Sequence, residues 1–111
     1  MTFKKFDVVV IPFPFSDRLD QKRRPALVIS SDDFNEQSGH FVAAMITSAK
    51  RSEWPSDVSL KVIEPAGLPS DCRVRMKLFT ADGSLVLKKI GRITPRDQKA
   101  VLASLKNTLA V

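Results

Sequence analysis

Three consecutive cations, residues 22–24, stand directly before Pro25 at the end of the first polar stretch of the chain. The residue that precedes a proline is pushed into extended geometry, so Arg24 is expected to be extended at the start of a strand. A preorganised guanidinium offers a rigid fork of donors that suits a phosphate group. The competing interpretation is that Arg24 only pairs with Asp17 or Asp20, which lie in the same polar stretch.

A hydroxyl is expected near this arginine. If the strand that begins at Pro25 pairs in antiparallel fashion with the following strand, Pro25 lies opposite Thr47 and Arg24 lies opposite Ser48. Cross-strand neighbours on one face of a sheet are about 5 Å apart at Cβ. The pairing therefore predicts that a cation and a hydroxyl share one end of the sheet.

An aromatic side chain among cations follows Thr47. The segment KRSEWP, residues 50–55, contains Lys50, Arg51 and Trp54. Single-strand nucleic-acid binding uses this combination, with a ring that stacks on a base and charges along the backbone. Trp54 could instead cover the core or lie in a dimer interface.

Apolar and basic side chains alternate over residues 72–79, CRVRMKLF. Because successive side chains of a strand point to opposite faces, Arg73, Arg75 and Lys77 are expected on one face. These cations could line a nucleic-acid groove, bind an acidic segment of a protein partner or simply be solvated. Cys72 falls on the apolar face and is interpreted as a small core residue.

Metal and histidine chemistry are not indicated. His40 is the single histidine, but the predicted hairpin places it far from Arg24, so we assign it a structural role. One histidine and one cysteine cannot form a zinc site, and no carboxylate cluster has the spacing that magnesium needs. We therefore expect neither a metal nor another cofactor.

Strands and one helix must position these residues. Apolar and β-branched runs predict strands over residues 6–13, 25–31, 41–48, 57–62, 72–79 and about 84–93. Residues 31–40 are interpreted as a polar connection. A final helix is predicted after Thr94 as N-cap, with Pro95 at its first position. Strands of irregular length around one core, followed by one helix, indicate a small, strongly bent sheet or barrel.

Length and charge narrow the class of protein. The 111 residues fit one domain, and 43% of them are hydrophobic, which predicts a packed core. A formal net charge of +6 favours polyanions or an acidic protein partner. The single cysteine fits a reducing cytosol, and no apolar run approaches the length that spans a bilayer. We therefore expect a cytoplasmic protein without a membrane partner.

Five segments can be compared with known families, in chain order DVVVIPFPFSD, KRRPALVIS, VAAMITS, GLPSDCRVRMKLFTAD and LKKIGRIT. Together they resemble the PemK/MazF toxins of type II toxin–antitoxin systems. The resemblance runs from about Phe6 into the C-terminal helix. It implies one toxin domain over residues 1–111, mainly β with a C-terminal helix, folded as a small SH3-like barrel of the kind shared with CcdB.

The resemblance also implies a function. It implies a metal-independent endoribonuclease that cleaves single-stranded messenger RNA at specific sequences, through attack by the ribose 2′-OH. The arginine before this proline and the threonine that ends the third strand are the recurring catalytic pair of such toxins, here Arg24 and Thr47. The RNA-binding residues are then expected to be Arg18, Lys22, Arg23, Ser48, Lys50, Arg51, Trp54, Arg73, Arg75 and Lys77.

The acid–base residue and the partners are less closely defined. Several relatives carry an acidic residue within the fifth strand, where this chain has VRMK at residues 74–77. Asp17 or Asp20 could supply the acid or base, or the reaction could proceed without a strong base. The implied partners are a second copy of the chain, an antitoxin with an acidic C-terminal segment, and operator DNA only through the antitoxin complex.

Two alternatives use the same barrel. One is a non-enzymatic binder, either a gyrase inhibitor like CcdB or a protein-interaction module. The other is a decayed toxin that still binds its antitoxin but has lost activity. The combination of Arg24 with Thr47 favours the enzyme, because a pure binding module would not need that pair.

Overall fold

The computed structural model describes residues 2–13 and 22–111. In this part of the chain the elements are β1 (Asp7–Phe13), β2 (Lys22–Val28), α1 (Asp32–Ser38), β3 (His40–Ser48), β4 (Val58–Ser59), β5 (Cys72–Asp82), the 3-10 helix η1 (Gly83–Leu85), β6 (Lys88–Arg92) and α2 (Pro95–Leu109). The strands form one antiparallel sheet in the order β4-β5-β3-β2-β1-β6.

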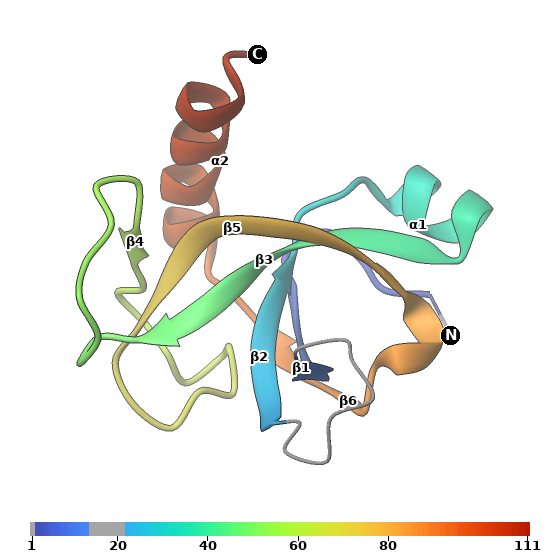
Figure 1. Cartoon of the computed structure of the whole chain (residues 1–111), viewed down its shortest axis with the longest axis horizontal. Helices are drawn as coiled ribbons and strands as arrows, with labels where there is room; N and C mark the ends of the chain where they lie inside the picture. The colour runs from blue at the N-terminus through green and yellow to red at the C-terminus, as the bar shows by residue number, and fades with distance from the viewer. Residues whose placement is uncertain (1, 14–21) are drawn as a thin grey trace.

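The sheet is strongly curled, and the prediction of a mainly β fold with a C-terminal helix is confirmed. Figure 1 shows β5 arching across the molecule, with α2 against one end of the sheet and α1 at the other. The register of the β3–β5 pairing shifts between Ala44 and Met45, where Met76 and Lys77 of β5 have no partner, and unpaired residues of this kind bend and twist a ladder.

Both faces of the central strands are buried because the sheet folds over itself. Val8 on β1 and Leu27 on β2 pack in one cluster together with Val101 of α2. Their neighbours Val9 and Ala26 point the opposite way, into a second cluster. Cys72 is 8% exposed in the first cluster, as predicted for a core residue.

The prediction that residues 31–40 form an irregular polar connection is wrong, because most of these residues form helix α1. Ser31 caps the helix by accepting a hydrogen bond from the backbone N–H of Phe34, and Gly39 ends it in the left-handed conformation with φ of 70°. The buried amide of Asn35 donates to the carbonyl of Phe3, which attaches the helix to the N-terminal segment.

Three strand predictions also need correction. β2 begins at Lys22 and ends at Val28, so Pro25 lies inside the strand and not at its start. The strand predicted over 57–62 is reduced to Val58–Ser59. The backbone N–H of Leu60 still donates to the carbonyl of Cys72, but those of Lys61 and Val62 donate to the buried carboxylate of Asp97. The strand predicted at about 84–93 starts only at Lys88, after η1.

Helix α2 begins where the sequence predicts. The side chain of Thr94 accepts a hydrogen bond from the backbone N–H of Asp97, and Pro95 occupies the first turn. Asp97 is only 1% exposed, so its carboxylate joins the start of α2 to the segment after β4.

Candidate functional site

The pairing of β2 with β3 differs by one residue from the predicted one. Val28 lies opposite Ala43, and Ala26 lies opposite Met45. The prediction that Pro25 faces Thr47 is therefore wrong, since the observed register, continued toward the strand ends, brings Arg24 opposite Thr47. The predicted register assumed an open connection between these strands, whereas most of that connection forms helix α1.

Arg24 and Thr47 line a shared hollow of about 200 Å³. Strand β1 contributes one wall, β2 and β3 the centre, and β5 and the segment after β3 the other wall. The residues that line it are Phe13, Arg24, Met45, Ile46, Thr47, Arg51, Arg75 and Lys77. Within the described part of the chain, the lining thus contains four cations and one hydroxyl group but no carboxylate.

Arg24 is held extended within β2 and pairs with Ile11 of β1. Its Nε atom is buried and has no hydrogen-bond partner among residues 2–13 and 22–111. A buried donor on a charged group is costly to leave unpaired. Its position in a hollow lined by other cations makes an anion the natural acceptor. The predicted alternative partners, Asp17 and Asp20, lie outside the described residues, as does Arg18.

Arg75 extends from β5 to the segment that follows β3. Its Nε and Nη2 atoms donate to the two oxygens of Asp57 at 3.1 and 2.9 Å, and Nη2 also donates to the carbonyl of Ser52 at 2.6 Å. The guanidinium carbon lies 4.7 Å from the ring centroid of Trp54. Arg75 therefore lies on the predicted face of β5, and its guanidinium is already hydrogen-bonded to other groups of this chain.

Arg73, which precedes Arg75 by two residues on β5, contacts the same segment. Its Nη1 donates to the carbonyl of Arg51 and its Nη2 to the carbonyl of Ala49, both at 2.9 Å. Glu53 lies 3.9 Å from its Nε. Arg73 does not line the hollow, so its visible role is to hold residues 49–53 against the sheet.

The remaining predicted RNA-binding residues lie around the hollow or beside it. Lys77 lines it, with its Nζ 5.6 Å from the ring centroid of Phe13. Lys22 and Arg23 are exposed at the start of β2, and Lys50 is exposed after β3. Ser48 accepts a hydrogen bond from the backbone N–H of Lys50 and does not line the hollow.

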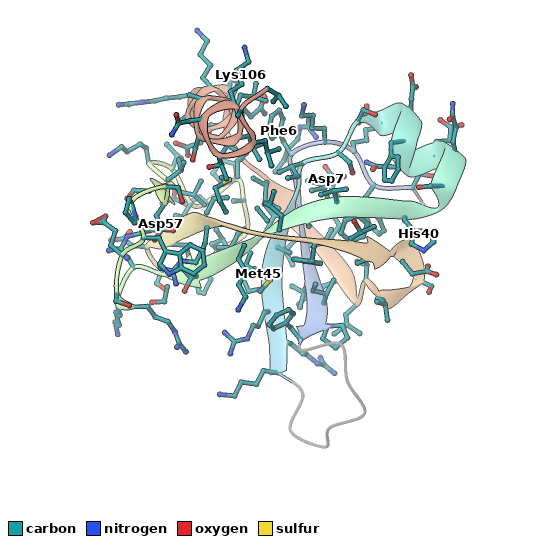
Figure 2. All side chains as sticks on the ribbon, turned by 45° about the horizontal axis from the view of Figure 1, so that its top comes forward. Phe6, Asp7, His40, Met45, Asp57 and Lys106 are labelled. Carbon is teal, nitrogen blue, oxygen red and sulfur yellow. The ribbon has the colours of Figure 1, made fainter. Side chains whose placement is uncertain are left out.

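His40 lies far from this site, as predicted. It opens β3, whereas Thr47 stands near the other end of the same strand, and its Nε2 is 3.9 Å from the carboxylate of Asp82. Figure 2 shows His40 and Asp57 at opposite ends of the molecule, with Met45 between them. Within residues 2–13 and 22–111 no three His, Cys, Asp or Glu side chains gather closely enough to hold a metal ion.

Asp57 is the functional candidate that sequence reasoning missed. Its side chain is 1% exposed and also accepts a hydrogen bond from the backbone N–H of Trp54 at 3.0 Å. Burial alone raises the pKa of this carboxyl, but the hydrogen bonds from Arg75 and Trp54 and the charge of Arg75 together lower it below 3.8. The only sequence signal was an acid three residues after an aromatic, in a segment rich in turn formers.

The lowered pKa of Asp57 predicts an acid-sensitive contribution to stability. Because the folded-state pKa is the lower one, the stabilisation is fully present above about pH 5 and is lost as the pH falls through the folded pKa, below 3.8. We expect Asp57→Asn to lower the free energy of unfolding by about 1–3 kcal/mol at pH 7.

Urea unfolding of both proteins between pH 7 and pH 2.5 measures this contribution. The difference between wild type and variant should shrink only at the acid end, since the other carboxyls titrate in both proteins. A difference that stays constant down to pH 2.5 would contradict the assignment.

The family model described as the PemK-like, MazF-like toxin of type II toxin-antitoxin systems matches residues 4–109. The chain belongs to this family. It is therefore a toxin of the PemK/MazF type, in agreement with the resemblance in its sequence. Among curated proteins, none matches the chain.

Solved structures show the same fold as this PemK/MazF-type toxin. A MazE–MazF complex from Deinococcus radiodurans superposes with a TM-score of 0.80 at 21% identity, covering 100% of this chain and 99% of that chain. An endoribonuclease with its cognate antitoxin from a mycobacterial species gives 0.76 at 15% identity, covering 99% and 95%. The Mycobacterium tuberculosis toxin MazF-mt6 gives 0.73 at 19% identity, covering 95% and 97%.

The described part of this toxin contains no helix that is long and apolar enough to cross a membrane.

Proposed function

We propose that the chain is an endoribonuclease that cleaves single-stranded messenger RNA at specific sequences, and that Arg24 and Thr47 are its catalytic pair. The observation that carries the proposal is the shared hollow, where an arginine with a buried, unpaired Nε stands beside a threonine hydroxyl among further cations. Membership of the PemK/MazF toxins and the likeness to solved endoribonucleases support the same reaction class.

The proposed reaction is an attack by the ribose 2′-OH on the adjacent phosphorus. The bond to the 5′-oxygen of the next nucleotide breaks, which leaves a 2′,3′-cyclic phosphate and a 5′-OH end. Negative charge builds on the phosphoryl oxygens in the transition state, where the preorganised guanidinium of Arg24 stabilises it. Thr47 donates a hydrogen bond to a phosphoryl oxygen or orients the 2′-OH.

The proton from the 2′-OH needs an acceptor. No carboxylate lines the hollow among residues 2–13 and 22–111, and Asp57 is held behind Arg75 by three hydrogen bonds. Within the proposal, Asp17 or Asp20 therefore takes this proton as the base, or water takes it without a strong base. The departing 5′-oxygen then receives a proton from the same carboxyl group or from water.

The partners of the proposed enzyme follow from its family. It acts in the cytoplasm as a homodimer and is inhibited by a cognate antitoxin, whose acidic C-terminal segment is attracted to the cations of the hollow. Operator DNA is bound only through the antitoxin complex. The structures of relatives that contain an antitoxin support this assignment.

Mapping of RNA ends tests the proposed function. The wild-type protein is expressed, and RNA from the same cells is sequenced for ends that carry a 5′-OH. The proposal expects new ends at a recurring sequence and arrest of growth. Arrest with intact RNA and gyrase-dependent DNA breaks would instead establish a binder like CcdB, while normal growth with intact RNA would establish a decayed toxin.

Replacement of Thr47 by valine tests the hydroxyl separately. Valine keeps the shape and the strand preference but removes the donor, so the fold should be retained. The loss of one hydrogen bond to a charged group corresponds to a fall in kcat/KM of about 10- to 100-fold. Cleavage of a fluorescent oligoribonucleotide measures it, with Thr47→Ser as the control that keeps the hydroxyl. Equal activity of Thr47→Val and wild type would remove Thr47 from the mechanism.

A further inference from the structure

The segment after β3, residues 49–57, is tied to β5 through its backbone. Two arginines on one face of β5 donate to three of its carbonyl groups: Arg73 to Ala49 and Arg51, and Arg75 to Ser52. We call this segment the 49–57 loop. The position of the loop is therefore set by side chains of a strand that comes more than 20 residues later in the chain.

Asp57 closes the loop and orients Arg75. Its carboxylate accepts from the Trp54 backbone N–H, and its own N–H donates to the Trp54 carbonyl at 3.0 Å, so residues 54–57 form a doubly closed turn. The same carboxylate binds Nε and Nη2 of Arg75 side by side. These two hydrogen bonds fix the orientation of the guanidinium, and in this orientation it lies over the ring of Trp54.

This unit borders the candidate active site. Arg51 and Arg75 line the same hollow as Arg24 and Thr47. Trp54 is 40% exposed although Arg75 lies over its ring, so the indole keeps surface on which an unpaired base can stack. The side chain of Asp57 is almost fully buried, and it therefore has no direct access to RNA.

We propose that Asp57 is a positioning residue for substrate recognition: its ion pair with Arg75 holds the 49–57 loop so that Trp54 stacks on a nucleobase next to the scissile phosphate. The inference rests on the proposed endoribonuclease function. Asp57 acts through Arg75 and Trp54 on binding and not on the chemical step, because neither Arg24 nor Thr47 depends on it for a hydrogen bond.

Steady-state cleavage of a short single-stranded RNA by Asp57→Asn tests the proposal. Asparagine has nearly the same shape but no charge to hold the guanidinium fork. Since a stacked base contributes to binding in the ground state as well as the transition state, KM should rise about 10-fold while kcat stays within about twofold. Glu53→Gln is the matched control, because it removes one negative charge from the same loop at an exposed side chain, and it should leave both constants unchanged.

Trp54 is the single tryptophan of the chain, so its fluorescence reports on the loop directly. An RNA with a 2′-deoxy substitution at the cleavage site binds without being cut. It should change the emission of the wild type and of Glu53→Gln strongly, and that of Asp57→Asn only weakly. Asp57→Glu keeps the charge and should restore part of the response. If circular dichroism shows Asp57→Asn to be unfolded, Arg75→Lys takes its place, because lysine lacks the fork and should raise KM in the same way.

The outcomes separate the two proposals. Suppose that the wild type cleaves RNA and that Asp57→Asn has the same KM and the same fluorescence response. This result overturns the role of Asp57 and leaves the proposed function standing. A fall in kcat at constant KM also overturns it, because it assigns Asp57 to the chemistry. A wild type that neither binds nor cleaves RNA overturns both.

Discussion

Replacement of Arg24 by alanine is expected to lower kcat/KM for RNA cleavage by about 10²–10³, the effect of removing one preorganised donor from a developing oxyanion. Arg24 is extended within a paired strand, its side chain lines the hollow, and its Nε has no hydrogen-bond partner in the described part of the chain, so the guanidinium is in place before RNA binds. A donor that needs no reorganisation acts mainly on the transition state, and we therefore expect the loss in kcat to exceed the rise in KM.

Two further variants make the Arg24 experiment specific. Arg24→Lys keeps the charge but not the fork, and it should recover only part of the lost rate. Arg96→Ala removes an exposed arginine at the start of α2 that does not line the hollow, and should cleave RNA as wild type does. The circular dichroism of all three variants should match the wild type. If Arg24→Ala cleaves RNA and arrests growth as wild type does, the site has been placed wrongly.

Replacement of Gly67 by alanine is expected to cost about 3–5 kcal/mol of the free energy of unfolding. Gly67 has φ of 73°, where a Cβ costs about 1–2 kcal/mol by itself. That Cβ would also overlap the backbone oxygen of Ile90 and lie 2.8 Å from its carbonyl carbon. Ile90 belongs to β6, which pairs with β1 and cannot move away without breaking the ladder, so the overlap adds a cost typical of overpacking.

Gly39→Ala is the matched control for this prediction. Gly39 has φ of 70°, almost the same backbone conformation, but no atom lies within 4 Å of the Cβ position. It should therefore show the backbone cost alone, about 1–2 kcal/mol. Urea unfolding monitored by circular dichroism measures both variants at equal pH and temperature. Equal losses at the two glycines would mean that the segment around Gly67 moves away from β6.

Much of the site was predictable because it depends on local backbone preferences. Arg24 is extended because a proline follows it, and this preference acts wherever the strand lies. Arg75 and Lys77 share a face because strand geometry alternates, whatever the partner strand is. The capping of α2 by Thr94 was likewise a matter of a few neighbouring residues.

The register of β2 and β3 was not predictable in the same way. The residues between these strands contain the capping signals of a helix, Ser31 and Gly39, but the helix is only 7 residues long and shows no apolar stripe. A helix this short is stabilised by its tertiary contact, here the hydrogen bond from Asn35 to Phe3. Because that contact is distant in sequence, the connection looked open and the register was one residue off.

The sequence by itself determined which residue types stand at the site: an arginine made rigid by proline, a hydroxyl at a strand end, and cations on one face of β5. Only the tertiary structure decided what each of them does. Arg73 and Arg75 carry the same charge on the same face, yet Arg73 binds loop carbonyls outside the hollow while Arg75 lines it with Asp57 behind. The physical reason is that charge and alternation are local properties, whereas the partner of a guanidinium depends on how the curled sheet brings distant segments together.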